Sequence, residues 1–173
     1  MGTGIIICGL NGAGKSTLGK ALAEKLGHYF IDSEDLYFSK QTDDYSLTFQ
    51  RTDREAEEIL FSKIEKHNDF VLASVKGNYG KEFYPFIKCA VLLDAPKDIR
   101  LQRVKNRSYQ KFGNRILPDG DLYEQEEAFF EFVKSRDEST VEEWIKTLNC
   151  PVIKLDGTKP VEENVNSMID RIK

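Results

Sequence analysis

The 173-residue chain lacks several features that would place it in a membrane, secreted or disulfide-rich class. No apolar run approaches the ~18 residues of a membrane-spanning helix, and the start of the chain shows no secretion signal. The three cysteines, Cys8, Cys89 and Cys150, form no C-x-x-C pair, so neither a disulfide framework nor a zinc site is expected. We therefore expect reduced thiols and a cytoplasmic protein.

An excess of positive charge is also missing, because 25 Lys and Arg residues stand against 29 Asp and Glu residues. Without a basic field, the chain is not expected to bind nucleic acid or an anionic membrane surface. Its length is sufficient for a single buried core. We expect one domain over residues 1–173 with a local site for a small molecule, and nothing in the sequence points to a particular oligomeric state.

What the sequence does contain is a complete phosphate-binding motif, G-x-x-x-x-G-K-[ST], over residues 9–16. The motif follows the apolar run 5–8 and precedes a helical pattern, which is the context that separates it from an ordinary glycine-rich turn. Its glycines let backbone N–H groups surround a phosphate, Lys15 adds positive charge at the β- and γ-phosphates, and Ser16 can ligate Mg²⁺. The motif predicts nucleoside triphosphate binding by Gly9, Asn11, Gly12, Ala13, Gly14, Lys15, Ser16 and Thr17.

Five short apolar runs are typical of parallel strands that are covered on both faces: residues 5–8, 29–31, 70–73, 90–93 and 152–155. Helical patterns separate them. Their end signals are a stop at Gly27, capping boxes beginning at Thr52 and Ser139, and Pro160 in the first turn of a last helix. This alternation predicts an α/β domain of three layers, with a five-stranded parallel sheet and helices on both faces. Ligands of such sheets bind beyond the carboxyl ends of the strands.

Three acids, Asp32, Glu34 and Asp35, follow the second predicted strand directly. One acid at this edge can hold magnesium through water, and another can accept a proton from an attacking hydroxyl or bind a hydroxylated substrate. The alternative is that Ser33 caps a short helix whose dipole the acids complement. Because Asp32 lies at the strand tip, we predict a catalytic and magnesium-side role for Asp32, and substrate contacts for Glu34 and Asp35.

Arginines follow the fourth predicted strand. Arg100, Arg103 and Arg107 lie at i, i+3 and i+7, on one helical face, and Arg115 follows in a loop that contains Gly113. Guanidinium groups that close over the γ-phosphate would stabilise the transition state, and a helix leading into a polar loop is typical of a lid. A solvated helix surface is the alternative. We predict catalytic roles for Arg103, Arg107 and Arg115.

With these residues the chain resembles the P-loop kinases of the nucleoside monophosphate kinase-like group, of the adenylate kinase and shikimate kinase type. The resemblance covers nearly the whole chain and rests on GLNGAGKST, FIDSED, LLDAPKDIRLQRVKNR and LDGTKPVEENV, in that order. It implies a P-loop fold, ATP with Mg²⁺, and phosphate transfer to a small acceptor. It places Gly157, Thr158 and Pro160 near the adenine, and Arg107 and Arg115 at the transferred phosphate. It further implies a substrate cap at about 33–68 and a lid at about 107–125.

The acceptor side departs from those relatives. Glu34 stands where shikimate kinases carry a second aspartate, and the loop after the third strand has neither their triple glycine nor the Gly-Phe-Pro-Arg type segment of adenylate kinases. That loop predicts a backbone-lined pocket, with a plain loop as the alternative. The predicted substrate contacts are Arg51, Lys76, Gly77, Asn78 and Tyr79. The cap also holds Tyr37, Tyr45 and Arg54, and for Arg54 a surface ion pair within the acidic helix is expected.

Two further patterns are assigned structural roles. Asp94 ends an apolar run like a Walker B strand, but we place the magnesium-side acid at Asp32. The helical stripe of Leu122, Phe129, Phe130 and Val133 is typical of core. The sequence therefore predicts an ATP-dependent small-molecule kinase. A GTPase would carry an N-K-x-D motif, which is absent, and a non-catalytic ATP-binding sensor is the remaining alternative.

Overall fold

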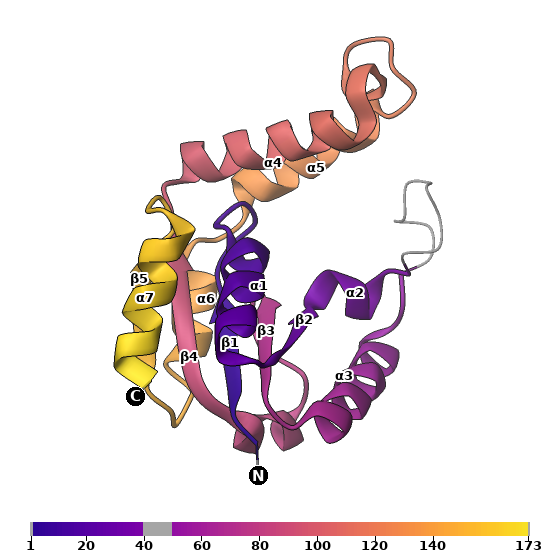
Figure 1. The fold of residues 1–173 in the computed structure, drawn as a ribbon. Coiled ribbons are helices and arrows are strands. Elements are labelled where there is room, and N and C mark those ends of the chain that lie inside the picture. Colours follow the sequence, from indigo (N-terminus) through magenta and orange to yellow (C-terminus); the bar gives the residue numbers. More distant parts are fainter. Residues whose placement is uncertain (1, 40–49, 173) are drawn as a thin grey trace.

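The computed structural model describes residues 2–39 and 50–172, so Tyr45 of the predicted cap lies outside the described residues. A five-stranded parallel sheet forms the centre of the protein (Figure 1). Its strands are β1 (Gly4–Cys8), β2 (Tyr29–Asp32), β3 (Phe70–Ser74), β4 (Ile87–Asp94) and β5 (Val152–Asp156), in the order β2-β3-β1-β4-β5. The predicted five-stranded parallel sheet is confirmed, with every strand found where an apolar run predicted one.

Helices connect and flank the strands (Figure 1). They are α1 (Lys15–Leu26), α2 (Ser33–Tyr37), α3 (Asp53–His67), α4 (Lys97–Phe112), α5 (Tyr123–Ser135), α6 (Ser139–Ile145) and α7 (Val161–Ile172). Two short 3₁₀ helices, η2 (Lys81–Phe86) and η3 (Gly113–Ile116), complete the described elements. No helix among the described residues is long and apolar enough to cross a bilayer.

The sheet separates two apolar clusters, which explains why β1 is apolar at every position. Ile5 and Ile7 pack with α1 and α7 on one face, whereas Ile6 and Cys8 pack with α2, α3 and α6 on the other. Since successive side chains of a strand point to opposite faces, a strand covered on both sides has no position for a polar residue. The three-layer prediction is confirmed.

The predicted end signals are mostly present. Gly27 ends α1 in the left-handed region (φ 69°), and Thr52 and Glu55 form the expected reciprocal capping box at α3. The predicted capping box at Ser139 is wrong. Asp137 Oδ1 instead accepts hydrogen bonds from the Ser139 backbone N–H (2.9 Å) and Oγ (2.8 Å). Because this local turn uses the Ser139 hydroxyl, that hydroxyl does not cap α6.

The segment predicted to form a lid, about 107–125, lies within a hairpin of α4 and α5, joined through η3, that projects beyond the sheet (Figure 1). It has a small core of its own, in which Val104 packs against Ile116, Leu122, Phe130 and Val133. Arg100 lies at its base and is almost fully buried. Its Nε donates to the Ala95 carbonyl (2.9 Å) and its Nη2 to Glu138 Oε1 (2.7 Å), so Arg100 holds the lid to the rest of the domain.

Candidate functional site

The phosphate-binding loop lies between β1 and α1, and three of its glycines have conformations or contacts that exclude a side chain. Gly12 and Gly14 adopt positive φ angles of 82° and 99°. A Cβ at Gly9 would overlap the Leu93 carbonyl oxygen, and a Cβ at Gly12 would overlap the Arg100 carbonyl oxygen. The loop is therefore pressed against β4 and α4, in a shape that leaves its N–H groups available for an anion.

Lys15 opens α1 beneath this loop. Its Nζ donates to the Leu10 carbonyl (3.1 Å). Burial, followed by repulsion from Arg107, lowers the Lys15 pKa from 10.5 to about 8, although Asp32 and Glu34 act in the opposite direction. Lys15 forms no ion pair with the residues that the structure describes. It is a partly desolvated cation whose charged form a bound phosphate would stabilise.

Ser16 and Asp32 meet across the gap between α1 and the end of β2. Ser16 Oγ donates to Asp32 Oδ2 at 2.5 Å, and Asp32 Oδ1 accepts from the Glu34 backbone N–H at 3.0 Å. The helix cap of α2 is therefore Asp32 and not Ser33, which corrects the sequence-based alternative. The two interpretations of Asp32 are compatible, because one carboxylate oxygen caps the helix while the other accepts a hydrogen bond from the Ser16 hydroxyl of the motif.

Arg103 joins the phosphate-binding loop to the loop that precedes α7. Its Nη1 donates to the carbonyls of Gly12 (3.2 Å) and Ala13 (3.4 Å), and its Nη2 donates to the Gly157 carbonyl (2.9 Å). Gly157 also donates its N–H to the Asp94 carbonyl (2.6 Å). Asp94 thus contributes through its backbone, as its structural assignment predicted, while Arg103 fixes the relative position of two loops.

The structure separates the other two predicted lid arginines. Arg107 is exposed and close enough to Lys15 to lower its pKa. Arg115 lies in η3, at the outer end of the lid (Figure 1), where Asp121 accepts hydrogen bonds from its Nε (3.0 Å) and Nη2 (2.8 Å). Arg103 therefore contacts the phosphate-binding loop, Arg107 acts on Lys15 through its charge, and Arg115 is paired with Asp121.

Sequence reasoning missed Arg136, which follows α5. Its Nη1 donates to Oδ1 of Asn11 in the phosphate-binding loop (3.0 Å), and its guanidinium lies over the Phe132 ring, 5.3 Å from the centroid. Burial lowers the pKa of Arg136. No motif spacing predicts this contact, because 125 positions separate the two residues; it depends on the α4–α5 hairpin folding back toward the loop.

The loop after β3 shows two kinds of side chain. Lys76 and Asn78 are partly or fully exposed, whereas Gly77 is buried and a Cβ there would lie 2.8 Å from the Trp144 ring. Tyr79 is 3% exposed, and its hydroxyl lies 3.1 Å from Ser74 Oγ. Burial raises the pKa of Tyr79 to about 12. The predicted substrate contact of Tyr79 does not hold in this structure, because its ring belongs to the core.

The predicted cap residues hold α2 and α3 together. Arg51 Nη1 donates hydrogen bonds to the carbonyls of Asp35 (3.1 Å) and Leu36 (3.2 Å), and the Tyr37 hydroxyl donates a hydrogen bond to Asp53 Oδ1 (2.9 Å). Arg51 thus fastens the carbonyl end of α2 in this conformation. The surface pair predicted for Arg54 is confirmed, since its Nε donates to Glu58 Oε1 (3.1 Å).

The loop before α7 is exposed at its tip. Asp156 Oδ1 accepts from the Thr158 backbone N–H (2.8 Å) and Oγ (2.6 Å), and Pro160 directly precedes α7. A Cβ at Gly157 would lie 2.6 Å from the Ala13 carbonyl oxygen, so this loop lies directly against the phosphate-binding loop. Gly157 therefore adjoins the phosphate-binding loop, and Thr158 and Pro160 follow it along the chain before α7.

Residues 5–146 match the model of a family described as AAA domain, and the chain belongs to that family. It is 30% identical over 174 residues to the uncharacterized protein YqaC of Bacillus subtilis (strain 168), an alignment that covers 96% of this chain and 95% of that protein.

Two similar proteins carry kinase names. The shikimate kinase of Psychrobacter arcticus is 32% identical over 108 residues, which are 57% of this chain and 58% of that protein. The crystal structure of a gluconokinase from Sinorhizobium meliloti 1021 has a TM-score of 0.53 and 20% identity, and the match covers 99% of this chain and 93% of that chain. The predicted membership of the nucleoside monophosphate kinase-like P-loop kinases is confirmed, and the fold is that of a P-loop kinase.

Proposed function

We propose that the protein transfers the γ-phosphate of ATP to a small acceptor, either a nucleoside monophosphate or a hydroxylated metabolite. The observation that carries this proposal is the convergence of Lys15, Arg107 and the Ser16–Asp32 pair at one end of the sheet. Lys15 and Arg107 would stabilise the negative charge that develops on the transferred phosphate. The Ser16 hydroxyl, held by the Asp32 carboxylate, would ligate a metal ion.

The residues at this end fit a magnesium–nucleotide complex. Ser16 Oγ would ligate the metal directly, and Asp32, 2.5 Å from that oxygen, would act on it through water. Mg²⁺ bound to the phosphates would neutralise charge on the transferring group. Among the described residues, no group of three His, Cys, Asp or Glu side chains could hold a metal.

The acceptor would lie between α2, the loop after β3 and Arg136. Glu34 is exposed and close enough to influence Lys15, which supports a position for Glu34 beside the acceptor. Lys76 and Arg136 are suited to hold an acceptor anion, and Glu34 is suited to accept a hydrogen bond or a proton from the acceptor hydroxyl.

The three cysteines are free thiols, as expected if the protein works in the reducing cytoplasm.

The direct test is ADP formation from Mg-ATP with a panel of nucleoside monophosphates and hydroxy acids, with mass spectrometry of the phosphorylated acceptor. We expect a phosphorylated product from at least one acceptor, and its loss in Lys15→Met. Lys25→Met, on the exposed end of the same helix, is the matched control and should keep full activity. Thermal stabilisation by ATP with no phosphorylated acceptor in the whole panel would contradict the proposal and favour a non-catalytic ATP sensor.

A further inference from the structure

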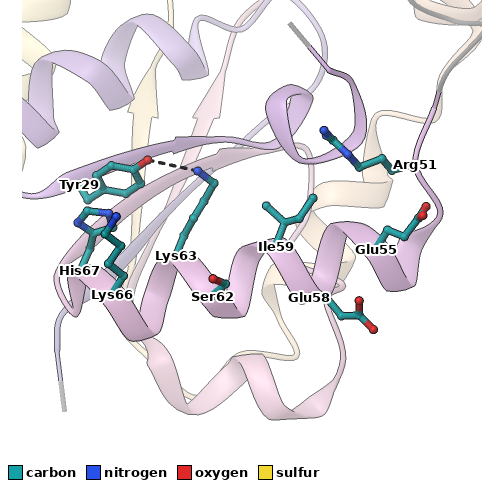
Figure 2. A pocket seen from close by; sticks show the side chains of 9 residues that line it. All are labelled: Tyr29, Arg51, Glu55, Glu58, Ile59, Ser62, Lys63, Lys66 and His67. Carbon is teal, nitrogen blue, oxygen red and sulfur yellow. Dashed lines mark hydrogen bonds between the residues drawn. The ribbon is translucent and has the colours of Figure 1, made fainter. Parts of the chain in front are cut away.

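A cavity separate from the phosphate-binding loop lies between β2 and α3 (Figure 2). Its volume is about 550 Å³, within the ~300–1,000 Å³ range of small-molecule sites, and it is lined by Tyr29, Arg51 and one side of α3 from Glu55 to His67. Tyr29 is level with Phe70 and Gly4, at the amino ends of their strands. The phosphate-binding loop follows the opposite, carboxyl end of β1, roughly 13 Å further along the strand.

One end of this cavity combines cations with an aromatic pair. Lys63 Nζ donates to the Tyr29 hydroxyl (3.2 Å) and lies 5.4 Å from the centre of its ring. The rings of Tyr29 and His67 stack with centroids 3.6 Å apart and planes within 1°. Figure 2 shows Lys66 and His67 at the same end as Tyr29, with Lys63 extending from α3 toward the phenol oxygen.

The acids at the other end do not neutralise these cations. Glu55 accepts from the Thr52 backbone N–H (2.8 Å) and Oγ (3.0 Å), and Glu58 accepts from Arg54. Lys63 and Lys66 form no ion pair within the part of the chain that the structure describes. The helix dipole explains basic residues in the last turn of α3, but it does not explain why Tyr29, from another element, completes a cavity beside them.

We propose that this end of the cavity binds a phosphate dianion, carried by a small phosphomonoester or present as free phosphate. Two ammonium groups, the Tyr29 hydroxyl and the Ser62 hydroxyl provide more donors than a carboxylate can use, and they match the three terminal oxygens of a phosphate. The body of a phosphomonoester would lie over Ile59, toward Arg51. A bound ligand would connect α3 with β2, and the site does not depend on the donor chemistry proposed above.

The test is a residue-resolved ¹H–¹⁵N titration with inorganic phosphate and, separately, with glycerol 3-phosphate. We expect saturable shifts at the amides of Tyr29, Lys63, Lys66 and His67, in addition to any shifts at residues 9–16. Shifts confined to residues 9–16 would overturn the proposal. Additional shifts at Ile59 with tighter binding of glycerol 3-phosphate identify a phosphomonoester as the ligand, and equal binding identifies free phosphate; both outcomes support the site.

Matched variants separate a site from general screening. Lys66→Met removes an exposed ammonium that no described contact uses, so the fold should persist, and it should weaken phosphate binding in the cavity about tenfold. Lys63→Met should do the same, with loss of the Tyr29 contact. Lys25→Met, in the last turn of α1, changes an equivalent helix-end lysine that does not line this cavity. An equal loss of binding in Lys25→Met and Lys66→Met, or equal shifts with chloride, would refute the cavity site.

Discussion

Lys15→Met should abolish phosphoryl transfer and yet stabilise the folded protein at neutral pH. In the folded protein the Lys15 pKa is about 8 instead of 10.5, which means that folding disfavours its charged form. At 1.36 kcal/mol per pKa unit, the shift destabilises the folded state by up to about 3 kcal/mol at pH 7. Part of the side chain is still exposed, so this figure is an upper value.

The pH dependence gives the prediction its sign. Between pH 8 and 10.5 the unfolded chain holds the Lys15 proton and the folded chain does not, so wild-type stability rises through this window. Methionine cannot titrate. The advantage of Lys15→Met should therefore be largest near pH 7 and should fall by about 2 kcal/mol by pH 9.5. Loss of the hydrogen bond to Leu10 subtracts about 1 kcal/mol at every pH and leaves this difference unchanged.

Urea denaturation of both proteins at pH 7 and pH 9.5, without nucleotide, measures the effect. Lys25→Met, on the exposed end of α1, should change stability by less than about 0.5 kcal/mol at both pH values. If the difference between Lys15→Met and wild type were the same at both pH values, Lys15 would not be the desolvated cation that the structure describes. The same result would remove the electrostatic reason for placing the transferred phosphate beside it.

Three further predictions concern the loop and its neighbours. Gly12→Ala should reduce nucleotide affinity at least tenfold in calorimetry, because the φ of 82° and the Arg100 carbonyl both exclude a Cβ; unchanged affinity would show that the loop shape is not required. Arg136→Ala should lower kcat/KM about a hundredfold while the surface variant Arg54→Ala retains wild-type turnover, and equal activities would exclude Arg136 from the site. Mg-ADP binding should take up a proton at pH 9 and none at pH 6.5, measured in buffers of different ionisation enthalpy, since a bound phosphate restores the Lys15 proton; uptake that is identical at both pH values would contradict this.

The sheet, the phosphate-binding loop and the helices could be predicted from local sequence patterns, because each depends on neighbouring residues. A strand covered on both faces must be apolar throughout, as β1 is, and a loop with positive φ needs glycine at Gly12 and Gly14. The resemblance to P-loop kinases followed from these local patterns in their order along the chain.

The contacts between polar side chains, in contrast, depend on how the helices and loops pack in three dimensions. Arg103, Arg115 and Arg136 carry the same guanidinium group but make different contacts. Arg103 joins two loops, Arg115 pairs with Asp121, and Arg136 donates to Asn11. Which of these contacts forms depends on how the α4–α5 hairpin packs and folds back. That packing depends on contacts between residues far apart in the chain, which no local spacing specifies.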